Sequence, residues 1–279
     1  MLDINIQTAE WPGEMEAILG ELQQLRESNA LLKKRQTEFE AELSLAARVQ
    51  QSLAPRSLVW NDVSVETHYS PAHTIGGDFG IVFPHNNEAL TVLMCDVSGH
   101  GIGPALMANR IYSETLQQLE REATPSKLLQ HLHDFARVRL AIDGFYFTMA
   151  AVRFSVGGRR ATFVGGGHPP AMHVSNGSVR LLESQNGILG GLSEPTRHAS
   201  WAEDIEFAPG DRLVLYTDGL VEVFDRLDNM LGVEGLETLV LQSAKRPLPE
   251  MRRTILEGVA AWGHGSLGDD VSLVIVEVR

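Results

Sequence analysis

Residues 75–101 read IGGDFGIVFPHNNEALTVLMCDVSGHG, and this stretch contains two apolar runs, each with an aspartate at one edge. Asp78 follows two glycines and leads into FGIVF, residues 79–83, whereas Asp96 lies near the end of ALTVLMCDV, residues 89–97. Short apolar runs bounded by glycine and asparagine are typical of strands. The stretch therefore predicts two strands that carry carboxylates at their edges.

Short apolar runs of the same kind recur through the chain after residue 56. Further strands are expected at residues 63–70, 147–156, 161–167, 178–183, 212–219 and 271–279. Helical patterns occupy residues 103–120, 125–140, 234–244 and 247–262. Because strands come in runs with helices grouped between them, the chain predicts an α+β fold rather than a βαβ winding. We expect two packed antiparallel β-sheets flanked by helices, an αββα sandwich, in one domain over residues 57–279.

A helix is expected to precede this domain. Apolar residues recur in alternating steps of three and four over residues 15–46, which is the period of a coiled-coil seam. Asn29 falls on the seam, where a buried amide favours a parallel two-stranded register. We therefore expect a tail at residues 1–13 and a coiled-coil helix of a homodimer at residues 14–54, which Pro55 ends. A single amphipathic helix lying on its own domain is the alternative.

Composition and charge argue against several classes of protein. The 279 residues carry a formal net charge of −13 with a pI near 5.2, which argues against binding to the phosphate backbone of nucleic acids. The single cysteine, Cys95, lies in the apolar run TVLMC, so we expect a buried thiol and no disulfide. No run approaches the roughly 20 apolar residues that cross a bilayer, and no leader pattern opens the sequence. The sequence therefore indicates a cytoplasmic protein that binds neither nucleic acid nor membrane.

Aspartates recur at strand edges further along the chain. Asp218 follows RLVLYT, and Asp269 and Asp270 precede the last strand, as Asp78 and Asp96 border the first two. Buried like charges need cations to neutralise them, and oxygen ligands suit Mg²⁺ or Mn²⁺ rather than zinc. If the strand ends converge, they form a cage for such ions. The alternative is that each aspartate is a turn or cap residue beside its glycine.

Five motifs follow one another in the order IGGDFG, CDVSGHGIGPALMANRI, FVGGGHPPAMHV, PGDRLVLYTDGLVEV and GDDVSLVIVEV. Their order and spacing resemble those of the metal-dependent, type 2C-like (PPM) serine/threonine protein phosphatases. Within that superfamily the chain resembles the bacterial RsbU/SpoIIE group. The resemblance covers residues 45–279, because LAARVQQSLAPRS also resembles the segment that joins sensor and phosphatase in that group.

The resemblance implies a set of metal ligands. The matching positions are the carboxylates of Asp78, Asp96, Asp218 and Asp269 and the backbone carbonyl of Val97. Asp270 then takes the second position of its motif, which is not the family's ligand position. The implied cofactors are Mn²⁺ or Mg²⁺, two ions with a third as an alternative.

The mechanism implied by the resemblance is direct hydrolysis. Two metal ions about 4 Å apart activate a water that attacks the phosphorus of a phosphoserine or phosphothreonine in line. Asp96 and Asp218 would hold the bridging pair, while Asp78 and Asp269 complete the shells. Neither a cysteine nor a serine nucleophile is required.

Two histidines in the motifs have competing interpretations. His100 is a candidate general acid for the leaving alkoxide. The histidine of eukaryotic relatives corresponds to Ser98, however, so a loop-shaping role for His100 is the alternative. His168 precedes two prolines, which favours a turn-forming role over metal ligation.

The resemblance to RsbU implies a phosphorylated STAS-domain protein, an anti-sigma-factor antagonist in a bacterial partner-switching pathway, as the substrate. An upstream regulator acting through residues 14–54 would switch metal occupancy. A catalytically silent dimeric scaffold that binds phosphoproteins is an alternative function. A diguanylate-cyclase-like enzyme is another, because GGDF resembles the Gly-Gly-Asp-Glu-Phe signature of cyclases. That signature needs glutamate after the aspartate, where this chain has Phe79.

Overall fold

The computed structural model describes residues 11–51, 54–140, 144–190, 202–265 and 268–279. The chain forms two compact units, Met1–Arg48 and Val49–Arg279. The domain limits inferred from the sequence, with a boundary at residues 54–57, stay predictions. The last residues of the N-terminal helix, from Val49 onward, thus belong to the second unit.

The helix α1 extends over Trp11–Gln51. In the first unit most of its large apolar side chains are exposed by 44% or more, among them Met15, Ile18, Leu22, Leu25, Leu32 and Phe39 of the expected seam, whereas Leu43 of the seam is half-buried. A single helix cannot bury such a stripe within itself, so the predicted coiled-coil homodimer stays a prediction that this surface motivates. Among the described residues, no helix has both the length and the apolarity that a bilayer crossing demands.

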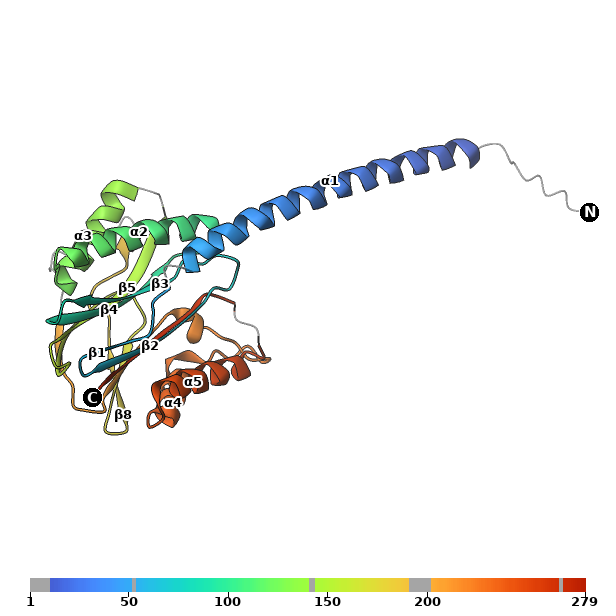
Figure 1. Ribbon diagram of the computed structural model, residues 1–279. Helices are drawn as coiled ribbons and strands as arrows, with labels where there is room; N and C mark the ends of the chain where they lie inside the picture. Colours follow the sequence, from blue (N-terminus) through green and yellow to red (C-terminus); the bar gives the residue numbers. More distant parts are fainter. Residues whose placement is uncertain (1–10, 52–53, 141–143, 191–201, 266–267) are drawn as a thin grey trace, which may run out of the picture. The chain divides into compact units, whose positions relative to one another are not determined.

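Two six-stranded antiparallel sheets form the centre of the second unit (Figure 1). The first sheet contains, in spatial order, β1 (Leu58–Trp60), β2 (Val63–Ser70), β12 (Val271–Val278), β11 (Arg212–Tyr216), β7 (Ala171–Ser175) and β8 (Ser178–Leu182). The second contains β10 (Glu203–Glu206), β6 (Arg160–Gly166), β5 (Tyr146–Ser155), β4 (Ala89–Val97) and β3 (Phe79–His85), with β9 (Leu189–Gly190) paired to β5.

Helices cover the outer face of each sheet. The helices α2 (Ile102–Glu120) and α3 (Pro125–Phe135) pack on the second sheet, and α4 (Gly232–Ser243) and α5 (Leu248–Trp262) pack on the first (Figure 1). This arrangement confirms the predicted αββα sandwich, with an N-terminal helix ahead of it.

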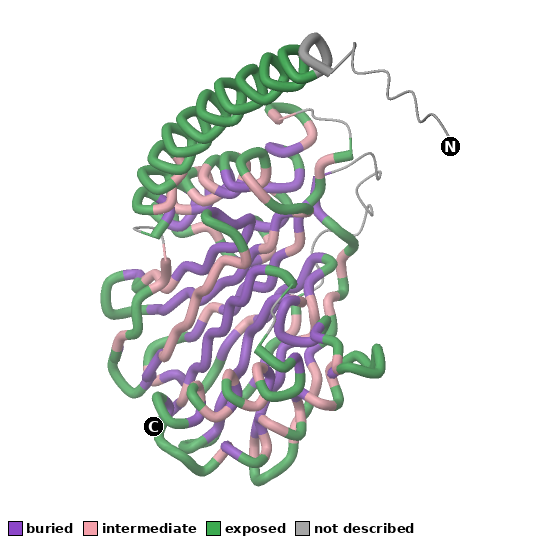
Figure 2. Tube along the Cα trace, turned by 90° about the vertical axis from the view of Figure 1, so that its right-hand side faces the viewer, coloured by how far each residue is buried: buried purple, intermediate pink, exposed green. Residues whose placement is uncertain are grey.

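Strand β4 shows why its sequence is apolar almost throughout. Leu90, Val92 and Met94 point into the core between the sheets, whereas Leu93 and Cys95 point into the core beneath α2 and α3. Side chains alternate between the faces of a strand, so a strand covered on both faces needs apolar residues at successive positions. Figure 2 shows the resulting buried strands at the centre of the unit. Cys95 is buried and free, as predicted.

The structure differs from the sequence-based expectations at some element ends. The strand predicted at residues 212–219 ends at Tyr216, and Asp218 opens the 3-10 turn η2 (Asp218–Leu220). The helix predicted at residues 125–140 ends at Phe135 and continues as the π-helical turn η1 (Ala136–Leu140). Strands β1, β7, β9 and β10 were not predicted. Strands β1, β9 and β10 have two to four residues, too few to show a period of two, and the five residues of β7 are buried almost throughout and show no alternation.

Candidate active site

The five aspartates lie where strands of both sheets begin or end. Asp78 directly precedes β3 and Asp96 is next to last in β4, and these strands pair so that Phe79 lies opposite Cys95. Asp218 follows β11, and Asp269 and Asp270 precede β12, whose first residues pair with the end of β11. Each sheet thus contributes one pair of adjacent strand ends.

Asp78 links the two sheets. Its carboxylate is 3% exposed, and its Oδ2 accepts hydrogen bonds from Thr217 Oγ1 at 2.7 Å and from Ser272 Oγ at 2.9 Å. Thr217 Oγ1 in turn accepts from the backbone N–H of Ser272 at 3.1 Å. A carboxylate that leads into the second sheet is therefore held by two hydroxyls at the strand ends of the first.

Burial and neighbouring carboxylates raise the pKa values of Asp78, Asp96 and Asp218. Burial, and next the charge of Asp96, raise the pKa of Asp78 well above its ordinary value. Burial and the charge of Asp218 raise the pKa of Asp96 to about 7, with contributions from Asp269 and Asp270. Burial and the charge of Asp269 raise the pKa of Asp218 to about 6. The five groups thus form one electronegative cluster, which protons or cations must neutralise.

Asp269 and Asp270 have different environments although they are neighbours. Asp270 is 4% exposed, and its carboxylate accepts from the backbone N–H groups of Ala72 at 2.8 Å and Gly77 at 2.6 Å. Asp269 is exposed, and its Oδ1 accepts from the N–H of Asp270 at 2.8 Å. The carboxylate of Asp270 is therefore engaged in fixing the segment before Asp78, whereas that of Asp269 faces outward.

Glycines allow these groups to approach. A Cβ at Gly76 would overlap the carboxylate of Asp270, and a Cβ at Gly77 would lie 2.7 Å from the carbonyl oxygen of Val97. A Cβ at Gly219 would overlap the backbone carbonyl of Asp270. The Gly-Gly-Asp segment does not form the hairpin that the cyclase alternative requires. It precedes β3, whereas the β3–β4 turn lies at residues 86–88, at the far end of β3.

The two histidines occupy different places. His100 is exposed in the loop before α2, where its ring centroid lies 4.9 Å from that of His73. His168 is buried; its Nδ1 pairs with Thr148 Oγ1 at 2.8 Å, and burial lowers its pKa to about 3, so the ring is neutral. Thr148 lies opposite Asp96 in the β4–β5 ladder, so His168 is paired with a cross-strand neighbour of a cluster carboxylate.

Some contributors gave no signal in the sequence. Thr217 and Ser272 lie within the TDG and DDVS motifs, yet nothing in the spacing shows that their hydroxyls meet Asp78. Gln50, at the end of α1, forms hydrogen bonds with Gly76, which lies two residues before Asp78. From the sequence alone, a glutamine on a charged helix is expected to be exposed to solvent.

The donor set has the chemistry of a site for hard divalent cations, because it consists of carboxylates and carbonyl oxygens. In the described parts of the chain, no group of three or more His, Cys, Asp or Glu side chains is already placed to hold a metal ion. The fit to divalent cations thus rests on the kind of donors and on the raised pKa values of Asp78, Asp96 and Asp218.

Solved structures place the fold among phosphatases of the PP2C type. The SiaA-PP2C domain of Pseudomonas aeruginosa superposes with a TM-score of 0.75 at 18% identity, over 88% of this chain and 98% of that domain. The catalytic domain of the serine/threonine protein phosphatase PstP, in complex with two manganese ions, gives a TM-score of 0.55 at 15% identity, over 77% of this chain and 98% of that one.

A protein-family model described as Stage II sporulation protein E (SpoIIE) matches residues 86–279, and the chain belongs to this family. Two curated relatives come from Bacillus subtilis strain 168. Phosphoserine phosphatase RsbU is 25% identical over 86% of this chain and 71% of its own length. Phosphoserine phosphatase RsbP is 24% identical over 65% of this chain, which spans 45% of that protein.

We predict that the metal-free protein loses stability as pH rises from about 4 to 7. The folded chain keeps protons on Asp96 and Asp218 up to about pH 7 and 6, whereas the unfolded chain releases them near pH 4. Thermal unfolding in EDTA at pH 5, 6, 7 and 8 measures this slope. Asp96→Asn should flatten it and raise the melting temperature at pH 8, and equal slopes for variant and wild type would contradict the prediction.

We predict that Gly219→Ala destabilises the domain, because the added methyl would push against the Asp270 carbonyl. Overpacking of this kind costs about 1–3 kcal/mol. Denaturant unfolding measures the change, with Gly103→Ala as the control, since a Cβ there meets nothing within 4 Å. A Gly219→Ala protein as stable as the control would contradict the prediction, because it would show that the backbone at Asp270, just before β12, shifts without a cost in stability.

Proposed function

We propose that this protein is a metal-dependent phosphoserine/phosphothreonine protein phosphatase. The cluster of aspartates at adjoining strand ends of both sheets carries the proposal, because crowded carboxylates such as Asp78, Asp96 and Asp218, whose pKa values are raised, attract divalent cations. The PP2C-type fold and the phosphoserine phosphatases RsbU and RsbP among its relatives support this reading.

The groups that would hold two Mn²⁺ or Mg²⁺ ions are the carboxylates of Asp78, Asp96, Asp218 and Asp269 and the carbonyl of Val97. When bound, such ions supply Lewis acidity and lower the pKa of water for attack on a phosphate monoester. Thr217 and Ser272 orient Asp78 within the set. Because the pKa of Asp96 is raised to about 7, cation binding would compete with a proton on this carboxylate below about pH 7.

Groups other than the aspartates have narrower roles. Cys95 is fully buried, and burial raises the pKa of its thiol, so it offers no accessible thiolate nucleophile. His100 is exposed in the loop that follows Asp96 and is the candidate general acid for the leaving alkoxide. The buried position of Cys95 and the exposed position of His100 are both compatible with hydrolysis by direct attack of water.

The proposed substrate is a phosphorylated STAS-domain protein, an anti-sigma-factor antagonist in a partner-switching pathway. The resemblance to RsbU, 25% identical over 71% of that protein, supports this assignment. A regulator that binds residues 14–54 and a homodimer formed through the same helix complete the proposal.

We predict Mn²⁺-dependent release of phosphate from p-nitrophenyl phosphate and from a phosphorylated STAS protein, abolished by EDTA. Asp218→Asn removes one cluster carboxylate and should lower turnover by about 100-fold or more, since even partners outside the coordination shell contribute 10–100-fold to metal affinity. Asp62→Asn, an exposed aspartate of the β1–β2 turn, is the matched control. Mn²⁺ binding without turnover of either substrate would instead identify a phosphoprotein-binding scaffold.

We predict that the full chain sediments at twice its mass of 30.6 kDa at micromolar concentration. Leu25→Lys with Leu32→Lys places charges on the exposed apolar seam and should yield monomers. Gln24→Lys with Thr37→Lys adds the same charge away from the seam and should leave the dimer intact. A wild-type monomer in sedimentation equilibrium would refute the coiled coil.

A further inference from the structure

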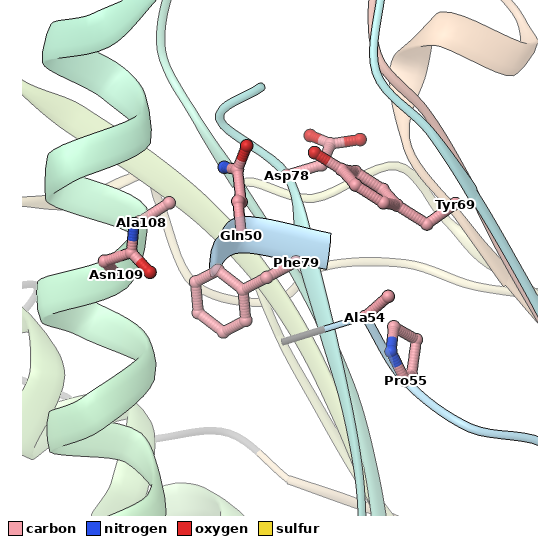
Figure 3. Close-up of a pocket in the computed structure, with 8 residues that line it drawn as sticks. All are labelled: Gln50, Ala54, Pro55, Tyr69, Asp78, Phe79, Ala108 and Asn109. Atoms are coloured by element: carbon pink, nitrogen blue, oxygen red, sulfur yellow. The ribbon is translucent and has the colours of Figure 1, made fainter. Parts of the chain in front are cut away.

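Gln50 is a buried polar side chain in the last turn of α1, within the second unit, and it is 6% exposed. Its amide nitrogen donates to the carbonyl oxygen of Gly76, and its Oε1 accepts from the N–H of Gly76 at 3.0 Å. One side chain thus satisfies both backbone groups of one residue. Figure 3 shows the Gln50 side chain rising from the end of α1 beside Asp78.

The chemistry of this pairing is specific to an amide. Backbone groups that are buried need partners, and only a planar group with a donor and an acceptor side by side can serve both at once. Leucine and methionine are similar in size but offer neither a donor nor a strong acceptor, and glutamate offers only acceptors at neutral pH. Replacement of Gln50 by leucine or methionine therefore leaves both Gly76 groups unpaired, and glutamate would leave the Gly76 carbonyl unpaired.

Three anchors fix the Gly76–Asp78 segment. Gln50 holds Gly76, the carboxylate of Asp270 accepts from Gly77 N–H at 2.6 Å, and the hydroxyls of Thr217 and Ser272 hold the Asp78 carboxylate. The second and third anchors come from strand ends of the first sheet. The first comes from α1, so the placement of Asp78 depends on a residue outside both sheets.

A small cavity lies against these groups. Its volume is about 10 Å³, close to the space of one water molecule, and its lining includes Gln50, Tyr69, Asp78 and Phe79 (Figure 3). The Tyr69 hydroxyl is buried and has no hydrogen-bond partner among the described residues. Loss of the Gln50 side chain would widen this space directly beside Asp78, so the carboxylate would gain freedom to move.

We propose that Gln50 is a positioning residue, which through Gly76 holds Asp78 beside Asp96 and so makes divalent-cation binding depend on the C-terminal end of α1. The inference rests on the proposed function in one respect, that Asp78 is a metal ligand. Gln50 itself touches neither substrate nor cation.

The test compares Gln50→Leu and Gln50→Met with wild type and with Gln51→Leu, in the full chain. Gln51 is the exposed next residue of α1 and controls for a change in helix composition. Hydrogen exchange of the metal-free proteins should show faster exchange at the Gly76 amide in both Gln50 variants and no change in the control. Isothermal titration with Mn²⁺ should show affinity weakened about 10–100-fold, as for other residues that orient metal ligands.

Steady-state kinetics supply a readout that general destabilisation would not produce. The Gln50 variants should need more Mn²⁺ for half-maximal turnover, with KM for the phosphate ester unchanged and kcat regained at saturating Mn²⁺. Faster exchange with wild-type Mn²⁺ affinity in either folded variant would overturn the positioning role, as would unchanged exchange in both. If wild type itself bound no Mn²⁺, the proposed function would fail together with this inference, whereas failure of the inference alone leaves wild-type turnover intact.

Discussion

The hydrogen bonds from Thr217 and Ser272 to Asp78 tie the two sheets together at the point where the acidic side chains meet. Asp78 precedes a strand of one sheet, and both hydroxyls belong to the strand ends of the other. Their geometry depends on the spacing of the sheets, which the apolar core between them sets. The packing of the sandwich therefore fixes how close the charges of the two sheets lie, and with that distance the pKa values of the carboxylates.

In the proposed function, the same crowding of carboxylates that destabilises the metal-free domain would give it affinity for cations. Burial and neighbouring charges raise the pKa values of Asp96 and Asp218, so the ionised cluster is held together by the rest of the fold. A bound divalent cation would neutralise the repelling carboxylates in place of protons. The free energy of cation binding would therefore also stabilise the folded domain. The glycines at residues 76, 77 and 219 belong to this arrangement, because a Cβ at residue 76 or 219 would overlap Asp270 and one at residue 77 would crowd the carbonyl oxygen of Val97.

Much of the architecture could be read from the sequence, because strand and helix periods are local. The αββα sandwich, the buried Cys95 and the placement of aspartates at strand ends follow from short apolar runs and their borders. The contacts within the site could not be read in this way. Thr217 and Ser272 meet Asp78 across separations of 139 and 194 residues, and such meetings depend on which strands share a sheet. The five motifs named the residues through their resemblance to a family, but not the hydrogen bonds that orient them.

Of the three anchors that fix the Gly76–Asp78 segment, the one from Gln50 does not come from a sheet. Anchors supplied by Asp270, Thr217 and Ser272 are present whenever the sandwich is folded, whereas the anchor from Gln50 requires an ordered end of α1. Two hydrogen bonds contribute about 1–3 kcal/mol together, which is the size of coupling that links effector and ligand sites in proteins. A regulator that orders or unwinds the end of α1 would thus change cation affinity by a factor of about 5–150 without touching a carboxylate. In this arrangement the proposed control through residues 14–54 would act on the site through the side-chain amide of Gln50, whereas the other anchors of the Gly76–Asp78 segment come from the sheets.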